Sequence, residues 1–462
     1  MILKGKYAFI IVFIGIITGF LAGMWGPVAL LGVAAFLTAL ALVLTKPETA
    51  VCFLVSYAVL DWGLRLVVPA MASLWDEAYL LALVLLWIFK WIVNRKEEGF
   101  QTAPLDLPVI IYIVTMTVVL ILNCQDYRIG VEGLRATIQY TLWYFVVLQL
   151  VTSPKSVRLV MVIFALVTGA MALHGVIQFI LGVEMPATWV DQNEAGVRTR
   201  VFSILTSPNI FGSLLTVGVP VTVALALTAK KKRGMLIFGG LAFFELSSLV
   251  FTFSRGAWIG FAVAALIYIL FKDKRLLIPG IILALILIVA VPSVSNRITY
   301  MLSPEYIQSS LKGGRLVRWQ QGLEILSFYP LMGVGFGQFG GAVAMNHRAK
   351  VMINATYVDT VYMDNYFLKT AVESGIVGFI AFSLVMYCVI INGHRTVVRC
   401  TENKDKVLRE LSIGMTAGLT GVIVHNFFEN IFETPLMSSV FWVFAALVMA
   451  VYNISCKGQA RG

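Results

Sequence analysis

The sequence predicts an all-α integral membrane protein: one polytopic domain over residues 1–462, with about 12 to 14 transmembrane helices and a large extracytoplasmic loop containing short helices. Three observations predict this fold class. Hydrophobic residues make up 59% of the chain and charged residues only 13%, and the mean hydropathy is +0.89. Apolar windows of about 17–25 residues, long enough to cross the hydrocarbon as helices, recur along the whole length. Basic residues are concentrated in alternate loops, as the positive-inside rule expects.

The candidate spans, in chain order, are 7–24, 28–45, 49–68, 78–94, 106–123, 134–151, 159–182, 209–228, 234–252, 255–271, 275–292, 371–392, 409–426 and 435–454. Each is expected to be helical, because a backbone in lipid must satisfy its own hydrogen bonds. Windows this long also exclude the shorter, alternating strands of a β-barrel. The weakest windows are 49–68, which contains Asp61 and Arg65, and 134–151. The window 7–24 runs into further apolar sequence without a small-residue cleavage site, so we expect a retained helix.

The net charge of +11 indicates how the chain is oriented in the membrane, and it does not indicate binding of nucleic acid. When Lys4 and Lys6 are assigned to the cytoplasm and the spans alternate, short cytoplasmic loops collect 22 of the 35 Lys and Arg residues, among them the KKKR at 230–233. Most of the others lie in two long outer segments, which the rule does not weigh. We therefore expect a multi-pass protein of the cell (inner) membrane that contacts the lipid bilayer, with both termini cytoplasmic and no nucleic-acid partner.

The two long segments, 183–208 and 293–363, both fall on the outer side. A structureless loop as long as the second is unusual, so it is expected to be folded and functional. Within it, residues 314–330 have the pattern of an amphipathic helix that Pro330 ends. The glycine-rich segment 333–341 follows as a turn region.

Polar and charged residues gather on the same outer side. Charged groups beside membrane segments are costly, so they usually mark a site or a tightly paired structural element. His425 and Glu429 end one span, and Asp364 precedes another. The candidate site residues are Arg198, Arg200, Asn209, Arg255, Arg315, Arg318, Asp364, Asn365, Glu373 and His425.

These residue types indicate glycosyl transfer from a lipid-linked diphosphate. Arg binds phosphate oxygens in a planar, bidentate manner and stays protonated in partly buried sites. A carboxylate or His could take the proton of an attacking hydroxyl, while arginines stabilise the charge that develops on the departing diphosphate. No cysteine pair or other candidate set shows metal-ligand spacing. We therefore expect no metal and no cofactor, with arginines replacing the usual divalent cation.

Several of these candidates also have a purely structural interpretation. Asp364 could be only a helix N-cap, and Lys369 and Glu373, four residues apart, could simply pair on one helix face. Arg255 could be an interfacial residue that snorkels to water. The candidates that could be ordinary loop charges or an interfacial histidine are Arg198, Arg200 and His425.

At these residues the sequence resembles the O-antigen ligase and polymerase superfamily of bacterial membrane proteins, over roughly residues 195–455. The segment FTFSRGAWIG (251–260) is similar to the family's Ser-Arg-Gly/Ala segment between two spans. GGRLVRWQQGLEILSFYPLMGVGFGQF (313–339) resembles its loop helix and the Pro-Leu-x-Gly-x-Gly-x-x-Phe that follows. In DNYFLKTAVESGIVG (364–378), Asn365 is followed by nine residues and Gly-x-x-Gly, and SPNIFG (207–212) is also typical.

The resemblance implies roles for several of these residues. Arg255 and Arg315 would bind the diphosphate, and Asp364 would take the place of a family histidine that is thought to act at the acceptor hydroxyl. The replacement of that histidine by Asp364 bears on the identity of the acceptor more than on the fold or the reaction class. Arg318 has no clear family counterpart, and His425 is an alternative base chosen only for its position. The expected substrate-binding residues are Arg198, Arg200, Arg318, Asn209, Asn365 and Glu373.

The expected function is therefore that of a metal-independent membrane glycosyltransferase for surface polysaccharide of the cell envelope. Its donor would be a glycan linked to a polyprenyl diphosphate such as undecaprenyl diphosphate. Its acceptor would be a second such glycan, as in a polymerase, or another lipid or polymer, as in a ligase; the sequence favours the polymerase slightly. The alternatives are a transporter or flippase of the same glycan and a non-enzymatic scaffold. A transporter is expected to carry charges near the midplane and internal repeats, and no repeat is evident.

Overall fold

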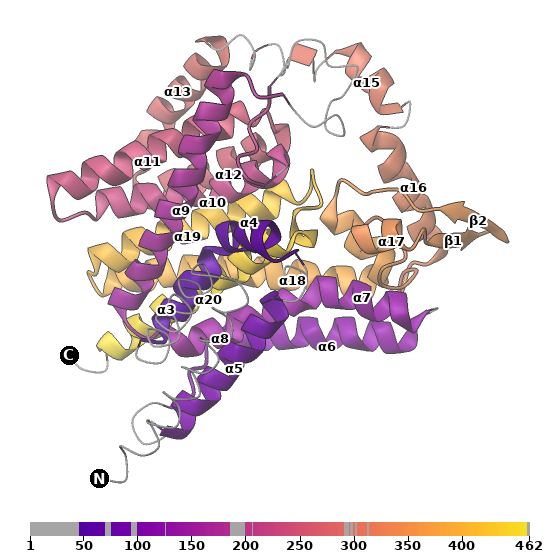
Figure 1. Ribbon diagram of the computed structural model, residues 1–462, viewed down its shortest axis with the longest axis horizontal. Coiled ribbons are helices and arrows are strands. Elements are labelled where there is room, and N and C mark those ends of the chain that lie inside the picture. Colours follow the sequence, from indigo (N-terminus) through magenta and orange to yellow (C-terminus); the bar gives the residue numbers. More distant parts are fainter. Residues whose placement is uncertain are drawn as a thin grey trace, which may run out of the picture. The chain divides into compact units, whose positions relative to one another are not determined.

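The computed structural model describes residues 46–69, 75–93, 99–124, 126–184, 199–205, 207–290, 295, 299–300, 303–311 and 314–459. The predicted spans 7–24 and 28–45 and the candidate residue Arg198 lie outside the described residues. Within the described part, seven helices are long and apolar enough to cross a membrane, or eight if the bent pair α3 (Glu48–Val55) and α4 (Tyr57–Val67) counts as one span. The chain is therefore an all-α, multi-pass membrane protein, as the sequence predicts (Figure 1).

Seven predicted spans are confirmed as long apolar helices. They are α9 (Pro154–Leu181), α10 (Pro208–Leu227), α11 (Lys232–Phe251), α12 (Arg255–Lys272), α18 (Tyr366–Glu402), α19 (Lys406–His425) and α20 (Pro435–Gln459). Local sequence explains where they begin. Ser153 caps α9 and Ser207 caps α10, and a proline follows each serine at the first helical position.

The helices that precede these seven differ more from the predicted spans. The 49–68 window bends by 70° between α3 and α4. The 134–151 window is not one continuous helix. It is covered by α7 (Tyr127–Ile138), a 3-10 turn at Gln139–Thr141 and the short α8 (Leu142–Leu150). Three further windows are covered by α5 (Trp75–Val93), α6 (Asp106–Leu122) and α13 (Leu277–Ala290). The total of about 12 to 14 spans stays a prediction.

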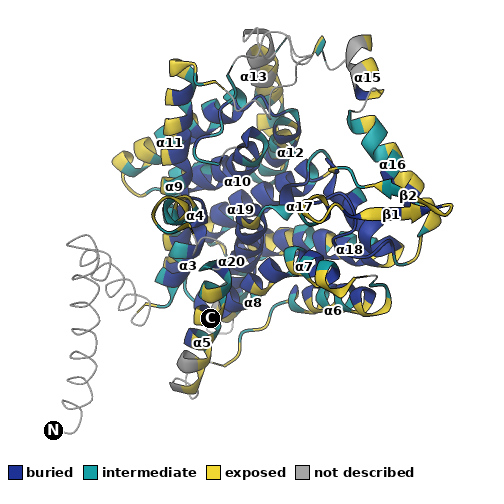
Figure 2. Ribbon diagram, turned by 45° about the vertical axis from the view of Figure 1, so that its right-hand side comes forward, coloured by how far each residue is buried: buried dark blue, intermediate teal, exposed yellow. Residues whose placement is uncertain are grey.

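The centre of the helical assembly is formed by α10, α19 and α20 (Figure 2). They bury 78%, 83% and 89% of the residues in their apolar windows, whereas α11 buries only 17%. Glycines allow the helices to approach closely. A Cβ at Gly418 would lie 2.9 Å from the Cα of Val217, and one at Gly421 would lie 2.7 Å from the carbonyl oxygen of Gly260. Helices α10, α12 and α19 therefore meet at their backbones, which holds their ends in fixed positions.

A break in the backbone divides α18 at Gly375, where φ is 66° and ψ is −169°. This conformation is essentially restricted to glycine. The loop segment 330–335 fills the break by exchanging hydrogen bonds with the helix. The exchanged bonds run from Val334 N–H to Val372 O (2.9 Å), Gly335 N–H to Glu373 O (3.0 Å), Ile376 N–H to Pro330 O (2.8 Å) and Val377 N–H to Leu331 O (3.4 Å). The loop thus satisfies the backbone groups that an unbroken helix would have paired internally.

The described part of the predicted outer loop, 293–363, has its own secondary structure. Its elements are α15 (Pro304–Leu311), α16 (Arg315–Phe328), α17 (Ala342–Asn346) and an antiparallel hairpin of β1 (Lys350–Ile353) and β2 (Thr356–Asp359). Helix α16 confirms that a helix forms within the predicted segment 314–330, although its buried residues are Gly322 and Ile325. The hairpin was not predicted, since four-residue strands are too short to show a clear alternating pattern.

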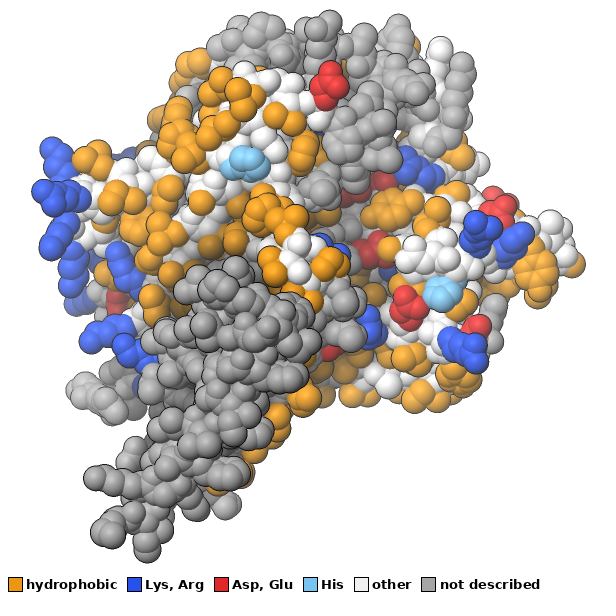
Figure 3. Space-filling model, in the orientation of Figure 1, with side chains coloured by type: hydrophobic (Ala, Val, Ile, Leu, Met, Phe, Trp, Pro, Cys, Tyr) orange, Lys and Arg blue, Asp and Glu red, His pale blue; other side chains and the backbone are white. Residues whose placement is uncertain are grey.

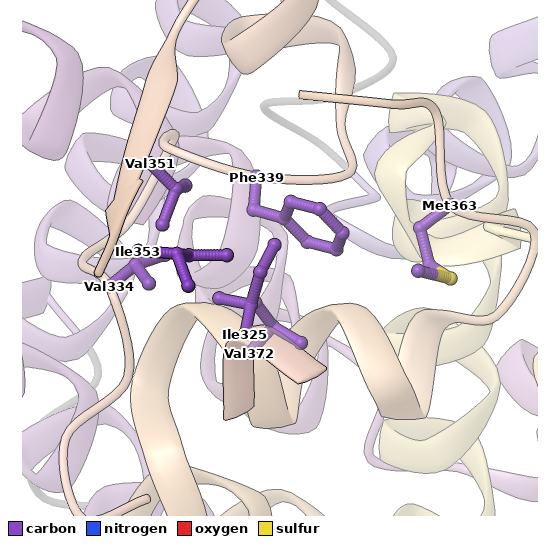
Figure 4. Close-up of a cluster of buried hydrophobic side chains, with 7 residues drawn as sticks. All are labelled: Ile325, Val334, Phe339, Val351, Ile353, Met363 and Val372. Carbon is purple, nitrogen blue, oxygen red and sulfur yellow. The ribbon is translucent and has the colours of Figure 1, made fainter. Parts of the chain in front are cut away.

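A small hydrophobic core joins this loop to α18 (Figure 4). The buried residues are Ile325, Val334, Phe339, Val351, Ile353, Met363 and Val372. They come from α16, the glycine-rich segment, the hairpin, and the start of α18 with the residues just before it. Because Met363 belongs to this core, the next residue, Asp364, is held near α16.

Charged side chains are distributed unevenly over the helix ends. Lys and Arg gather around the turn between α10 and α11, where the sequence has KKKR at 230–233 (Figure 3). Acidic and basic side chains are mixed on the opposite side, around the hairpin. This polarity agrees with the predicted cytoplasmic position of the α10–α11 turn, although the sidedness itself stays a prediction.

Candidate active site

Two arginines of α16 hold the carboxylate of Asp364. Arg315 and Arg318 are three residues apart at the start of the helix and therefore lie on the same face. Arg315 Nε lies 3.3 Å from Asp364 Oδ2, and Arg318 Nη1 lies 3.0 Å from Asp364 Oδ1. Each carboxylate oxygen of Asp364 thus has its own guanidinium partner, which is a strong, charge-assisted arrangement.

Glu429, just beyond the end of α19, extends this network toward α10. Its Oε2 accepts a hydrogen bond from Asn209 Nδ2 at 2.6 Å and lies 3.4 Å from Arg315 Nη2. Arg200 Nη2 donates to Asn209 Oδ1 at 2.9 Å, and Arg200 Nε donates to the carbonyl of Thr252 at 2.9 Å. A continuous chain of contacts therefore joins five segments of the protein. In order, it contains Arg200, Asn209, Glu429, Arg315, Asp364 and Arg318.

The network combines three positive charges with two negative ones, which leaves a net charge of 3 − 2 = +1. The side chains of Arg315 and Arg318 are 30% and 29% exposed, whereas those of Asp364 and Glu429 are 9% and 12% exposed. The guanidinium groups can therefore reach a ligand, while the carboxylates lie beneath them. Burial raises the pKa of Glu429, and the positive charge of Arg315 opposes this effect. The arrangement suits an anion such as a diphosphate.

Arg255 and His425 lie where α12 begins and α19 ends. Ser254 caps α12, so Arg255 is the first helical residue and is half-buried. The next residue, Gly256, packs on the imidazole ring: a Cβ there would lie 2.8 Å from His425 Cδ2. His425 is 1% exposed, and its ring nitrogens have no hydrogen-bond partner among the described residues. The histidine is thus held tightly against the α12 backbone.

Asn365, and not Asp364, is the N-cap of α18. Asn365 Oδ1 accepts the N–H of Leu368 at 2.9 Å. The structural interpretation of Asp364 as a cap is therefore wrong, since its carboxylate binds arginines. Capping explains why an asparagine stands at this position, and the contact of Asn365 with substrate stays a prediction.

Glu373 forms the buried ion pair that its spacing allowed. Lys369 Nζ lies 2.9 Å from Glu373 Oε2, with the two side chains 7% and 2% exposed. The other oxygen, Oε1, accepts the N–H of Gly337 at 2.8 Å. Both oxygens are thus used to fasten the glycine-rich loop to α18. The predicted contact of Glu373 with substrate has no support from this geometry.

Glu429 lies just after the predicted span 409–426, but no role was predicted for it from the sequence. The signal that was present is a carboxylate four residues after His425 in VHNFFEN. Its importance comes from Asn209 and Arg315, which are 220 and 114 residues away in the chain. No local pattern reports such contacts.

Two comparisons with known proteins bear on this site. Residues 240–383 match the family model described as O-antigen ligase, and this range contains α12, α16 and Asp364. A protein of Haemophilus influenzae, described as an uncharacterized protein, is 26% identical over 259 residues, which cover 51% of this chain and 60% of the relative. The chain therefore spans less than two thirds of the length of that relative.

Proposed function

We propose that the protein transfers a polyprenyl-diphosphate-linked glycan to an acceptor hydroxyl, since residues 240–383 match the family model described as O-antigen ligase. The reaction would take place on the outer face of the cytoplasmic membrane. The observation that carries the proposal is the network at Arg200, Arg315 and Arg318. These arginines come from two distant segments, are joined through the carboxylates of Asp364 and Glu429, and carry an excess of positive charge beside the membrane helices.

The proposed reaction follows from the charges. The oxygen of the acceptor hydroxyl forms a bond with the anomeric carbon of the donor, and the bond from that carbon to the diphosphate oxygen breaks. The leaving diphosphate takes the electron pair, and arginine side chains stabilise its additional negative charge. A protein group accepts the hydroxyl proton. Among the described residues, no group of three or more His, Cys, Asp or Glu side chains has an arrangement that could hold a metal ion. The arginines would serve as the counter-charge of the diphosphate.

A transporter or flippase of lipid-linked glycans remains the alternative function. Transporter sites lie near the bilayer midplane. The network instead lies at helix ends: Asn209 near the start of α10, Asp364 before α18, and Glu429 after α19. This position favours chemistry at one surface over passage through the membrane.

The test uses the purified protein in detergent. Its substrate is the lipid extract of host cells from which this chain has been deleted, because that extract contains both the unused donor and the unmodified acceptor. We expect a glycan product of higher mass and an equal amount of free polyprenyl diphosphate. A flippase reconstituted in vesicles would move the donor between leaflets and release no polyprenyl diphosphate, and that result would contradict the proposal.

A further inference from the structure

The candidate proton acceptors at or near the network are Asp364, His425 and Glu429. Asp364 is fully occupied, because a different arginine holds each of its oxygens at 3.3 and 3.0 Å. A proton on Asp364 would remove the charge that holds both arginines in place. Asp364 is therefore suited to orient the guanidinium groups and poorly suited to exchange a proton during each turnover.

His425 is held too closely to act without movement. Its ring is 1% exposed and packs on α12, where Gly256 and Gly260 leave room for it. A Cβ at Gly256 would lie 2.9 Å from His425 Nε2. The imidazole therefore faces protein backbone, and a general base must come within hydrogen-bond reach of the hydroxyl that it deprotonates.

Glu429 differs from both groups. The contacts of its carboxylate with Asn209 Nδ2 and Arg315 Nη2 both fall on Oε2. A proton could therefore be added at Oε1 without breaking either of these two contacts; the backbone N–H of Asn430 also interacts with the carboxylate. The side chain is 12% exposed, lies outside the membrane-spanning segments, and has a pKa that burial raises above its usual range. A carboxylate with a raised pKa is a stronger base at neutral pH.

Resting on the function proposed above, we infer that Glu429 is the catalytic base that accepts the proton of the acceptor hydroxyl. In this step the hydroxyl oxygen bonds to the anomeric carbon, its proton passes to Glu429 Oε1, and the diphosphate departs with the electron pair. Asp364 is then a positioning residue for Arg315 and Arg318. Glu429 lies outside residues 240–383, the range that matches the family model.

The decisive variant is Glu429→Gln, because the amide keeps the size of the side chain and one oxygen acceptor but cannot take the proton. We expect kcat to fall by about 100-fold or more, as for loss of a general base. The affinity for undecaprenyl diphosphate alone, measured by titration, should change by less than about threefold. Asp364→Asn should mainly weaken that affinity. The matched control is Glu132→Gln, which changes a carboxylate that is 44% exposed and pairs with His347.

A second variant separates proton transfer from positioning. Glu429→Gly opens space for a small carboxylate, and added formate should restore part of kcat in Glu429→Gly but not in Asn209→Ala. Rescue requires a folded protein, so it also excludes misfolding as the cause of the loss. An active wild-type protein whose Glu429→Gln variant keeps kcat within about threefold, or a Glu429→Gly variant that formate does not rescue, overturns this inference and leaves the proposed function intact. An inactive wild-type protein overturns both.

Discussion

Arg315 is the residue at which the two acidic groups of the site meet. Its guanidinium contacts Asp364 through Nε and Glu429 through Nη2. Because these contacts use two different nitrogen donors of one planar group, an arginine can hold both carboxylates, whereas a lysine presents only a point charge. The same group is 30% exposed and can contact a ligand from its open side.

Replacement of Arg315 should therefore affect donor binding first. We expect Arg315→Ala to weaken binding of undecaprenyl diphosphate by about 10- to 100-fold, since charge-assisted hydrogen bonds contribute roughly 1.5–3 kcal/mol. Arg315→Lys should recover only part of this loss. The affinity is measured by titration in detergent, with Arg128→Ala, at an exposed position, as the control. Unchanged affinity in Arg315→Ala would contradict a role in binding the diphosphate.

At the scale of elements, the break in α18 explains two glycine motifs at once. Residues 330–335 replace one turn of helical hydrogen bonds around Gly375. The two segments must approach backbone to backbone, so side chains are excluded on both sides. A Cβ at Gly375 would collide with the carbonyl of Leu331, and one at Gly333 would collide with the carbonyl of Val372. The positions of Gly333 and Gly375 therefore allow the loop 330–335 to insert into the break in α18.

Gly375→Ala should destabilise this insertion. Its conformation, with φ of 66° and ψ of −169°, costs a residue with a Cβ about 1–3 kcal/mol, and the collision with Leu331 adds to that cost. We expect a lower thermal midpoint in detergent, followed by tryptophan fluorescence, and reduced transfer activity. Gly239→Ala in α11 is the matched control, because a Cβ there meets no atom within 4 Å. Equal midpoints for the two variants would show that the break tolerates a side chain.

On the scale of the whole molecule, the site is assembled from the ends of helices that cross in alternate directions. Asn209 lies at the start of α10, Thr252 follows α11, Asp364 precedes α18 and Glu429 follows α19. Alternating helices bring these particular ends to one side of the membrane. The KKKR turn at 230–233 lies at the other end of α10 and α11, so the charge rule predicts that the site faces outward.

Cysteine labelling in whole cells tests this orientation. In a chain whose five cysteines are replaced by serine, Tyr357→Cys in the hairpin should react with a membrane-impermeant maleimide added outside. Lys231→Cys, in the KKKR turn, should react only after the membrane is permeabilised. Both positions are exposed, so accessibility within the protein does not limit either reaction. The reverse labelling pattern would place the arginine network in the cytoplasm and rule out transfer at the outer face.

Much of this protein follows from local sequence. Hydropathy over about 20 residues reports the cost of placing a segment in lipid, and that cost does not depend on neighbouring helices. Seven long helices and the helix α16 were therefore predictable. The two weakest windows were those in which charged or polar residues interrupt the apolar pattern.

Only the tertiary structure decided which polar residues act together. Asn365 and Asp364 are adjacent in the chain, yet one caps a helix and the other binds two arginines. Glu429 is bound by Asn209 and Arg315, which are far from it in the chain. The helix break at Gly375 is filled by a loop about 40 residues earlier, around Gly335. Hydrogen bonds and ion pairs depend on the distance in space between two atoms. Local sequence therefore determines the cost of burying each group, and the packing of α10, α16, α18 and α19 determines its partner.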